Sequence, residues 1–293
     1  MSIVITGASG QLGRSTAELV LGRVPASEVI LTTRHPEEIS DLAERGAEVR
    51  EADFERPEAL VGAFEGGEKL LLVSTDAVGT RVAQHRAAIE AAGKAGVCHV
   101  IYTSYLNPVE DNPAPVTADH RETEKALRES GLAWTALRNG LYAEYQVPPG
   151  AQAIVSGRLV HNNGDGETAY VSREDCAAAA AAVLSTEGHE GEVYDITGPL
   201  PLGQNDVAAL LSGLSGRPVE AVAVDDEEFI RGLAAAGMPE PAARGVASFG
   251  RAIREGFIGE ASGAVEKLTG RPPRTLLEVF EDHRGELMQG VVA

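Results

Sequence analysis

Short apolar runs alternate with amphipathic stretches through the first half of this 293-residue chain. The runs are rich in β-branched residues and the stretches between them have helical spacing, a pattern typical of parallel strands joined by helices. The predicted strands are Ile3–Thr6, Val29–Thr33, Ala47–Arg50, Lys69–Val73, His99–Thr103 and Ala133–Arg138. The predicted helices are Leu12–Gly22, Pro36–Arg45, Pro57–Phe64, Arg81–Ala95 and Asp119–Ser130. The sequence therefore predicts an α/β fold with a doubly wound, Rossmann-type parallel sheet.

The alternation ends at about residue 145, where Pro148–Gly150 is predicted to interrupt the chain. Beyond it we predict short strands at Arg158–His161 and Val219–Val224, a helix over Cys176–Leu184 and a strand near 192–197 that returns to the sheet. Residues from about 203 to 285 read as mostly helical. We expect a first domain over 1–150 and, over 151–293, mainly a smaller helical lobe that covers one edge of the sheet.

The composition of the chain limits the kinds of partner that it is expected to bind. A net charge of −19 disfavours a broad basic face for nucleic acid or for an anionic membrane. Cys98 and Cys176 lie in apolar stretches, so we expect two buried free thiols and no disulfide framework. No apolar run has transmembrane length, and because the chain enters a predicted strand directly we expect no signal peptide. We therefore expect a cytoplasmic protein without membrane or nucleic-acid partners and without a metal.

A glycine-rich turn follows the first strand and precedes the first helix. Gly7 permits a tight turn, Gly10 permits close approach of a phosphate, and Gly13 lets the helix pack on the strand. The alternative is an ordinary turn, but the strand–turn–helix context favours a dinucleotide pyrophosphate at the helix N-terminus. The residues expected to bind it are Gly7, Ser9, Gly10, Gln11 and Leu12.

Arg34 ends the second predicted strand, where an acidic residue would accept the ribose 2′-hydroxyl of NAD. An arginine at this place accommodates the 2′-phosphate of NADP. The simpler alternative is a solvated charge at a strand end. The sequence predicts NADP(H) as the cofactor.

Polar and aromatic side chains follow the other predicted strands. Asp53 and Phe54 are candidates for the adenine site, with a helix N-cap and a core aromatic as the alternatives. The candidates near the nicotinamide ribose are Ser74, Thr75, Arg81, Thr103 and Ser104. Asn139 and Tyr142 follow the sixth strand, so we expect them at the nicotinamide end. Asn139 could bind a carboxamide there, or could instead hold the loop.

Short-chain dehydrogenases commonly carry a Tyr-x-x-x-Lys pair on the helix after the fifth strand. Here that helix contains no tyrosine, and His120 and Glu124 stand at roughly the two positions. His120 could donate a proton, although a lone histidine is more often structural. Without the pair, ordinary alcohol oxidation is disfavoured, because it requires a base for the alkoxide.

These features together resemble the NmrA-like atypical short-chain dehydrogenases, and within them the group of bacterial quinone oxidoreductases type 2 and triphenylmethane reductases. The resemblance spans nearly the whole chain and rests on G-A-S-G-Q-L-G (7–13), A-D-F (52–54), K-L-L-L-V-S (69–74), H-R-E-T-E (120–124), S-G-L-A-W-T-A-L-R-N-G-L-Y-A-E (130–144) and L-T-G-R-P-P-R-T-L-L-E (268–278). It implies a Rossmann domain that binds NADPH and a small helical substrate lobe. It also implies hydride transfer to quinones or similar conjugated aromatic acceptors. Tyr105 and Leu141 depart from the quinone reductase pattern, so the resemblance leaves the acceptor open.

Such acceptors are already electrophilic, so positioning and exclusion of water matter more than acid catalysis. Tyr142, Asn139 and Tyr105 are the candidate catalytic residues, with Tyr142 as the best proton donor, and Tyr145 is a further candidate to line the pocket. Packing under the lobe is the alternative for each tyrosine. Two other functions stay open: a non-catalytic NADP(H)-binding redox sensor that acts through a protein partner, and a reductase or isomerase of a biosynthetic intermediate. The chain is expected to be a monomer or a homodimer.

Overall fold

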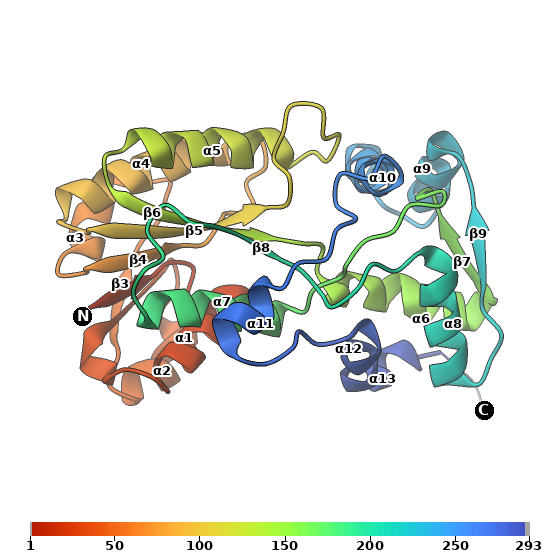
Figure 1. Cartoon of the computed structure of the whole chain (residues 1–293), viewed down its shortest axis with the longest axis horizontal. Coiled ribbons are helices and arrows are strands. Elements are labelled where there is room, and N and C mark those ends of the chain that lie inside the picture. The colour runs from red at the N-terminus through yellow and green to blue at the C-terminus, as the bar shows by residue number, and fades with distance from the viewer. Residues whose placement is uncertain (1, 291–293) are drawn as a thin grey trace.

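A seven-stranded parallel sheet forms the centre of the computed structural model, which describes residues 2–290 (Figure 1). Its strand order is β3-β2-β1-β4-β5-β6-β8. The strands are β1 (Ile3–Ile5), β2 (Val29–Thr33), β3 (Glu48–Glu51), β4 (Lys69–Leu72), β5 (His99–Tyr105), β6 (Ala133–Asn139) and β8 (Val193–Ile196). The predicted doubly wound sheet and its returning strand near 192–197 are confirmed. The order reverses between β1 and β4, and this switch point is where open α/β sheets bind ligands.

Alternate residues along the strands supply two separate cores. Ile3, Leu71 and Ile101 pack on one face, and Val4 and Leu70 pack on the other. The first face is covered by α1 (Gln11–Val20), α2 (Ser40–Glu44), α7 (Arg173–Ser185) and α11 (Ala264–Thr269). The second face is covered by α3 (Leu60–Phe64), α4 (Arg81–Lys94) and α5 (Thr117–Glu129). Figure 1 shows α4 and α5 on one side of the sheet and α1, α7 and α11 on the other.

The alanine-rich segment of α7 is buried along its whole length. Ala177–Ala182 lie between the sheet and the neighbouring helices, with 0–6% of their surface exposed. Small side chains permit this close approach, as the sequence suggests. Ser172 caps the helix by accepting from the backbone N–H of Asp175 at 3.0 Å, so α7 begins three residues before the predicted start.

The lobe is mostly helical and has its own core. It contains α6 (Val147–Ser156), α8 (Gln204–Ser215), α9 (Asp226–Ala235), α10 (Glu240–Arg254), α12 (Leu276–Asp282) and α13 (Arg284–Leu287). Strands β7 (Arg158–His161) and β9 (Glu220–Ala223) pair in parallel as a second, two-stranded sheet. Short 3₁₀ helices are η1 (Ala26–Glu28), η2 (Pro36–Ile39), η3 (Pro57–Ala59) and η4 (Ala143–Gln146).

Two sequence-based expectations are wrong. Pro148–Gly150 does not interrupt the chain but lies in the first turn of α6, where proline is tolerated because the N–H groups there have no helical partner. Cys98 is exposed, because it lies in the turn between α4 and β5 rather than inside an element; Cys176 is buried as expected.

The second half of the chain contributes to both parts of the molecule. Helices α7 and α11 and strand β8 belong to the core around the large sheet, whereas the remaining elements after residue 150 build the lobe. We propose a domain boundary near residue 150, with α7, α11 and β8 as later elements that belong to the first domain. Within residues 2–290 no helix is both long and apolar enough to cross a membrane.

Candidate functional site

The glycine-rich turn has the geometry that a pyrophosphate requires. Gly7 has φ +60°, a conformation that side chains rarely adopt. A Cβ at Gly13 would lie 2.2 Å from the carbonyl oxygen of Gly7, so only glycine lets α1 pack this closely on the turn. Gly10 caps α1 without a side-chain hydrogen bond. The N–H groups of the first helical turn, which begins with Gln11 and Leu12, therefore have no capping side chain and are available to an anion.

Ser9 ties this turn to the end of β2. Its hydroxyl lies 2.7 Å from the hydroxyl of Thr33, which also accepts the backbone N–H of His35 at 3.2 Å. The backbone N–H of Ala8 donates to the carbonyl of Thr32 at 3.0 Å. These contacts fix the phosphate turn beside the residue that follows β2.

That residue is Arg34, and its side chain is exposed. In the part of the chain that the structure describes, its guanidinium has no ion pair and no hydrogen bond. Arg14, by contrast, is paired with both Glu18 and Asp41. Arg34 therefore has all its donors available for an anion next to the glycine turn, as a ribose 2′-phosphate would require.

Asp53 and Phe54 follow β3, and their contacts within the protein agree with local structural roles. The Asp53 carboxylate accepts the backbone N–H of Glu55 at 3.0 Å, which is the turn-stabilising role. Phe54 is partly buried against the core on the α4 side of the sheet. Both lie at the ligand-binding edge, and their contact with an adenine stays a prediction.

The segment that follows β4 is held in place by His85, a residue that sequence reasoning missed. The N–H of Thr75 donates to Nε2 of His85 at 3.2 Å, and Nδ1 of His85 lies 3.0 Å from the hydroxyl of Thr123. Because Nε2 accepts, His85 is neutral with its proton on Nδ1. Burial, reinforced by the Arg81 charge, lowers the pKa of His85 to about 4. The only signal in the sequence is a histidine one turn into the helix after β4.

Arg81 stabilises the same segment, the loop between β4 and α4. Its guanidinium donates to the Asp119 carboxylate at 3.0 Å and to the Thr75 carbonyl at 3.0 Å, and 5% of the side chain is exposed. Asp119 also accepts the backbone N–H of Gly79 at 2.8 Å. Arg81 is thus a positioning residue for the loop, and its direct contact with a cofactor stays a prediction.

Ser74 and Thr103 meet across β4 and β5. The Thr103 hydroxyl accepts the N–H of Ser74 at 2.8 Å and donates to the Ser74 hydroxyl at 3.3 Å. Small side chains at both positions leave the backbone of this edge open to close approach. The arrangement agrees with the predicted ribose site but has no ligand contact that tests it.

The side chain of Ser104, another candidate near the ribose, is hydrogen-bonded within the protein. Its hydroxyl donates to Glu124 at 2.7 Å, and Arg138 binds both oxygens of the same carboxylate at 2.8 and 2.9 Å. Burial opposes ionisation, but these hydrogen bonds prevail and lower the pKa of Glu124. Glu124, at roughly the position expected for a catalytic lysine, is therefore a structural carboxylate, and the Ser104 hydroxyl, whose proton it accepts, keeps only acceptor lone pairs for a cofactor.

His120 stands at roughly the position where the catalytic tyrosine is expected. It is buried, and its Nδ1 lies 2.7 Å from the hydroxyl of Tyr102. Burial, followed by the charge of Arg81, lowers the pKa of His120 well below its ordinary value. A neutral, hydrogen-bonded imidazole is a poor proton donor near neutral pH, so the structural role is favoured.

Asn139 and Tyr142 form a pair at the end of β6. The Asn139 amide donates from Nδ2 to the Tyr142 hydroxyl at 3.2 Å. Asn139 is buried, and its Oδ1 has no hydrogen-bond partner among the described residues. An orphaned acceptor is costly unless a ligand donor satisfies it, and a carboxamide N–H fits that need.

Arg173, which sequence reasoning also missed, packs over two tyrosine rings that contact each other with centroids 5.7 Å apart. Its guanidinium carbon is 5.1 Å from the Tyr142 ring centre and 4.9 Å from that of Tyr145, within cation–π range. Glu144 accepts the backbone N–H of Arg173 at 2.8 Å and lies 3.8 Å from its guanidinium. Tyr145 is 59% exposed, so it belongs to the rim rather than the interior of the site.

Tyr105 lies beside Asn139 across the β5–β6 pairing. Its ring stacks on His120 with centroids 6.1 Å apart and meets Phe249 of α10 edge-on at 6.0 Å. The strand ends thus place Tyr105 beside Asn139, which binds Tyr142, and the predicted catalytic roles of the three residues stay predictions.

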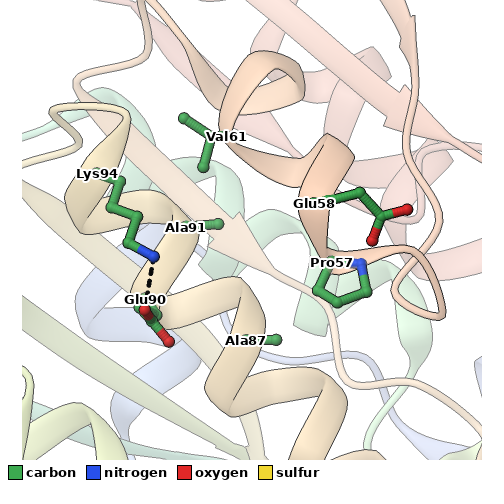
Figure 2. Close-up of a pocket in the computed structure, with 7 residues that line it drawn as sticks. All are labelled: Pro57, Glu58, Val61, Ala87, Glu90, Ala91 and Lys94. Atoms are coloured by element: carbon green, nitrogen blue, oxygen red, sulfur yellow. Dashed lines mark hydrogen bonds and ion pairs between the residues drawn. The ribbon is translucent and has the colours of Figure 1, made fainter.

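Grooves on the outer surface are separate from this arrangement. One lies between η3, α3 and α4 and is lined by Pro57, Glu58, Val61, Ala87, Glu90, Ala91 and Lys94 (Figure 2). Its charged side chains are exposed, and Lys94 is paired with Glu90 at 2.6 Å. None of the candidate site residues lines it. The residues that the structure describes also contain no group of three or more His, Cys, Asp or Glu placed to hold a metal ion.

A family profile described as NAD(P)H-binding matches residues 7–187, which include the glycine turn, Arg34 and the Asn139–Tyr142 pair. The chain belongs to the NAD(P)H-binding family. Its expected cofactor class, a nicotinamide dinucleotide, is therefore confirmed.

Individual relatives agree over nearly the whole length. Quinone oxidoreductase 2 of Escherichia coli (strain K12) is 39% identical over 276 residues, which are 94% of this chain and 96% of that protein. The crystal structure of the Escherichia coli NADPH-dependent quinone oxidoreductase complexed with NADPH superposes with a TM-score of 0.92 at 38% identity, covering 96% of this chain and 99% of that one. Triphenylmethane reductase of Citrobacter sp. complexed with NADP(H) gives a TM-score of 0.88 at 37% identity, again covering 96% and 99%. These matches confirm the expected resemblance and the class of enzyme, an NAD(P)H-dependent oxidoreductase.

Proposed function

We propose that this member of the NAD(P)H-binding family reduces a quinone or a similar conjugated aromatic acceptor with NADPH, without a Tyr-x-x-x-Lys pair. The observation that carries the proposal is the Asn139–Tyr142 pair, with its orphaned Oδ1, at the opposite end of the strand edge from the glycine turn and Arg34. The two relatives named for quinone and triphenylmethane reduction support the choice of acceptor class.

The residues present fit NADPH along the whole edge. The turn at Gly7, Ser9, Gly10, Gln11 and Leu12 would hold the pyrophosphate, Arg34 the 2′-phosphate, and Asp53 and Phe54 the adenine. Ser74, Thr75, Thr103 and Ser104 would border the nicotinamide ribose, in a loop that Arg81 and His85 hold in place. When bound, NADPH supplies the hydride.

Asn139 has two tasks in this arrangement. Its free Oδ1 would accept from the carboxamide and orient the nicotinamide ring. Its Nδ2 donates to a lone pair of the Tyr142 hydroxyl, so the proton of that hydroxyl is left for a third partner. The pair therefore presents one acceptor toward the cofactor and one donor toward the substrate.

Tyr142 would donate that proton to the reduced acceptor. Burial raises the pKa of Tyr142, so the phenol is protonated at neutral pH and can act as a donor but not as a base. A quinone gains two electrons and a hydrogen as hydride, and a proton from Tyr142 or from solvent completes the hydroquinone. A triphenylmethyl cation is neutralised by the hydride alone and needs no proton.

The test is NADPH oxidation, followed by nicotinamide absorbance, with benzoquinone, menadione, a larger naphthoquinone and a triphenylmethane dye as acceptors. NADH serves as the control for cofactor preference. Turnover with at least one acceptor, faster with NADPH than with NADH, is the expected result. Tight NADPH binding without oxidation by any of the acceptors would contradict the proposal and favour a redox sensor instead.

A further inference from the structure

The hydroxyl of Tyr105 has no hydrogen-bond partner among residues 2–290, although it is buried. Its ring is fixed from both sides, by His120 of α5 and by Phe249 of α10 in the lobe. Tyr105 also belongs to a buried apolar cluster that includes Leu106 and Ile253. Phenylalanine would fill the same space without leaving a desolvated hydroxyl.

The position of Tyr105 gives that hydroxyl a use. Tyr105 pairs with Asn139 across the end of the sheet, and the N–H of Leu106 donates to the Asn139 carbonyl at 3.3 Å. Asn139 in turn carries the second orphaned atom of this edge and binds Tyr142. Tyr105 and Tyr142 are therefore both neighbours of Asn139, Tyr105 through the strand pairing and Tyr142 through a side-chain hydrogen bond.

We propose that Tyr105 is a specificity-determining residue whose hydroxyl donates a hydrogen bond to an oxygen of the acceptor. This inference rests on the proposed function and deepens it, because it assigns a preference for acceptors that carry a carbonyl oxygen over triphenylmethyl cations. A quinone offers lone pairs to the donor, whereas the nitrogens of such a dye share theirs with the cationic system. Tyr105 is protonated at neutral pH, because burial raises its pKa, so its hydroxyl can donate this hydrogen bond.

The experiment compares menadione with an oxygen-free triphenylmethane dye in the full-length enzyme. Tyr105→Phe is expected to lower kcat/KM for menadione roughly tenfold, the effect of one lost hydrogen bond, and to leave the dye within about twofold. Tyr194→Phe is the matched control, because it removes a phenol hydroxyl that bonds His189 at 2.9 Å, away from the candidate site. It should leave the ratio of the two kcat/KM values unchanged.

Two further results distinguish failure of this inference from failure of the proposed function. Wild-type turnover with an unchanged ratio in Tyr105→Phe would overturn the inference alone, whereas a wild type that reduces neither acceptor would overturn both. The melting temperature of the unliganded Tyr105→Phe protein should not fall, because an unpartnered hydroxyl contributes no stabilising bond. A clear fall would show that the hydroxyl is bonded within the protein and would contradict the assignment.

Discussion

Replacing Arg34 with serine should weaken NADPH binding and leave NADH binding nearly unchanged. Arg34 follows β2 directly, and its guanidinium is free of protein partners among the described residues, so no intramolecular ion pair competes with a ligand. The substitution by serine therefore removes no hydrogen bond or ion pair that stabilises the fold. The whole effect should therefore fall on the 2′-phosphate, which NADPH carries and NADH lacks.

Hydrogen bonds to charged groups contribute about 1.5–3 kcal/mol, which corresponds to roughly a 10- to 100-fold change in the dissociation constant. Because Arg34 is exposed, solvent screening places the expected value toward the lower end, and added salt should reduce it further. We expect the dissociation constant for NADPH to rise about 10- to 30-fold at low ionic strength.

The assay is titration of both cofactors, followed by nicotinamide fluorescence, in wild type and variant. Arg45→Ser is a matched control, because Arg45 is also exposed and lies at the C-terminal end of α2. It should leave both affinities unchanged. Equal weakening of NADPH and NADH in Arg34→Ser, or no weakening of either, would refute the assignment of the 2′-phosphate to this residue.

Three other variants test separate parts of the account. Tyr142→Phe should lower menadione turnover about tenfold or less, with NADPH affinity and dye turnover unchanged in the same assays; abolished dye turnover would contradict a role limited to proton donation. His85 has a pKa of about 4 in the fold against 6.5 for the free side chain, so the unfolded chain binds the extra proton and stability falls as pH drops below 6.5. Urea unfolding should show a loss of about 2 kcal/mol from this group between about pH 7 and pH 5. His85→Gln should remove that part of the loss, and an unaltered pH dependence would count against the buried neutral imidazole. Gly13→Ala places a Cβ 2.2 Å from the Gly7 carbonyl, so NADPH titration should show severely weakened binding; near-normal affinity would mean that the turn tolerates a side chain.

Local signals made much of the fold and the position of the glycine turn predictable. The strand, the glycine turn and α1 are consecutive in the sequence, so the spacing of Gly7, Gly10 and Gly13 is enough to identify the turn. Arg34 is predictable for the same reason, because its meaning depends only on its place after a strand. Asn139 and Tyr142 needed the additional knowledge that all strands end at one edge.

Contacts between distant segments explain what the sequence did not predict. Ser104 is bound by Glu124 from the next helix, and Arg81 by Asp119, 38 residues away. Arg173 reaches Tyr142 and Tyr145 only because the start of α7 runs beside the end of β6. Such pairings depend on packing between helices and strands, which periodicity does not encode.

The most direct test of the central claim is transfer of deuterium from NADPH labelled at C4 of the nicotinamide to a triphenylmethane dye. The account predicts deuterium at the central carbon of the reduced dye and slower reduction with the labelled cofactor, because the hydride passes directly from C4 of the nicotinamide to that carbon. Reduced dye without the label, from the cofactor deuterated on either face, would contradict direct transfer at this site. Bound NADPH that stays unoxidised with every acceptor would contradict the reductase function itself.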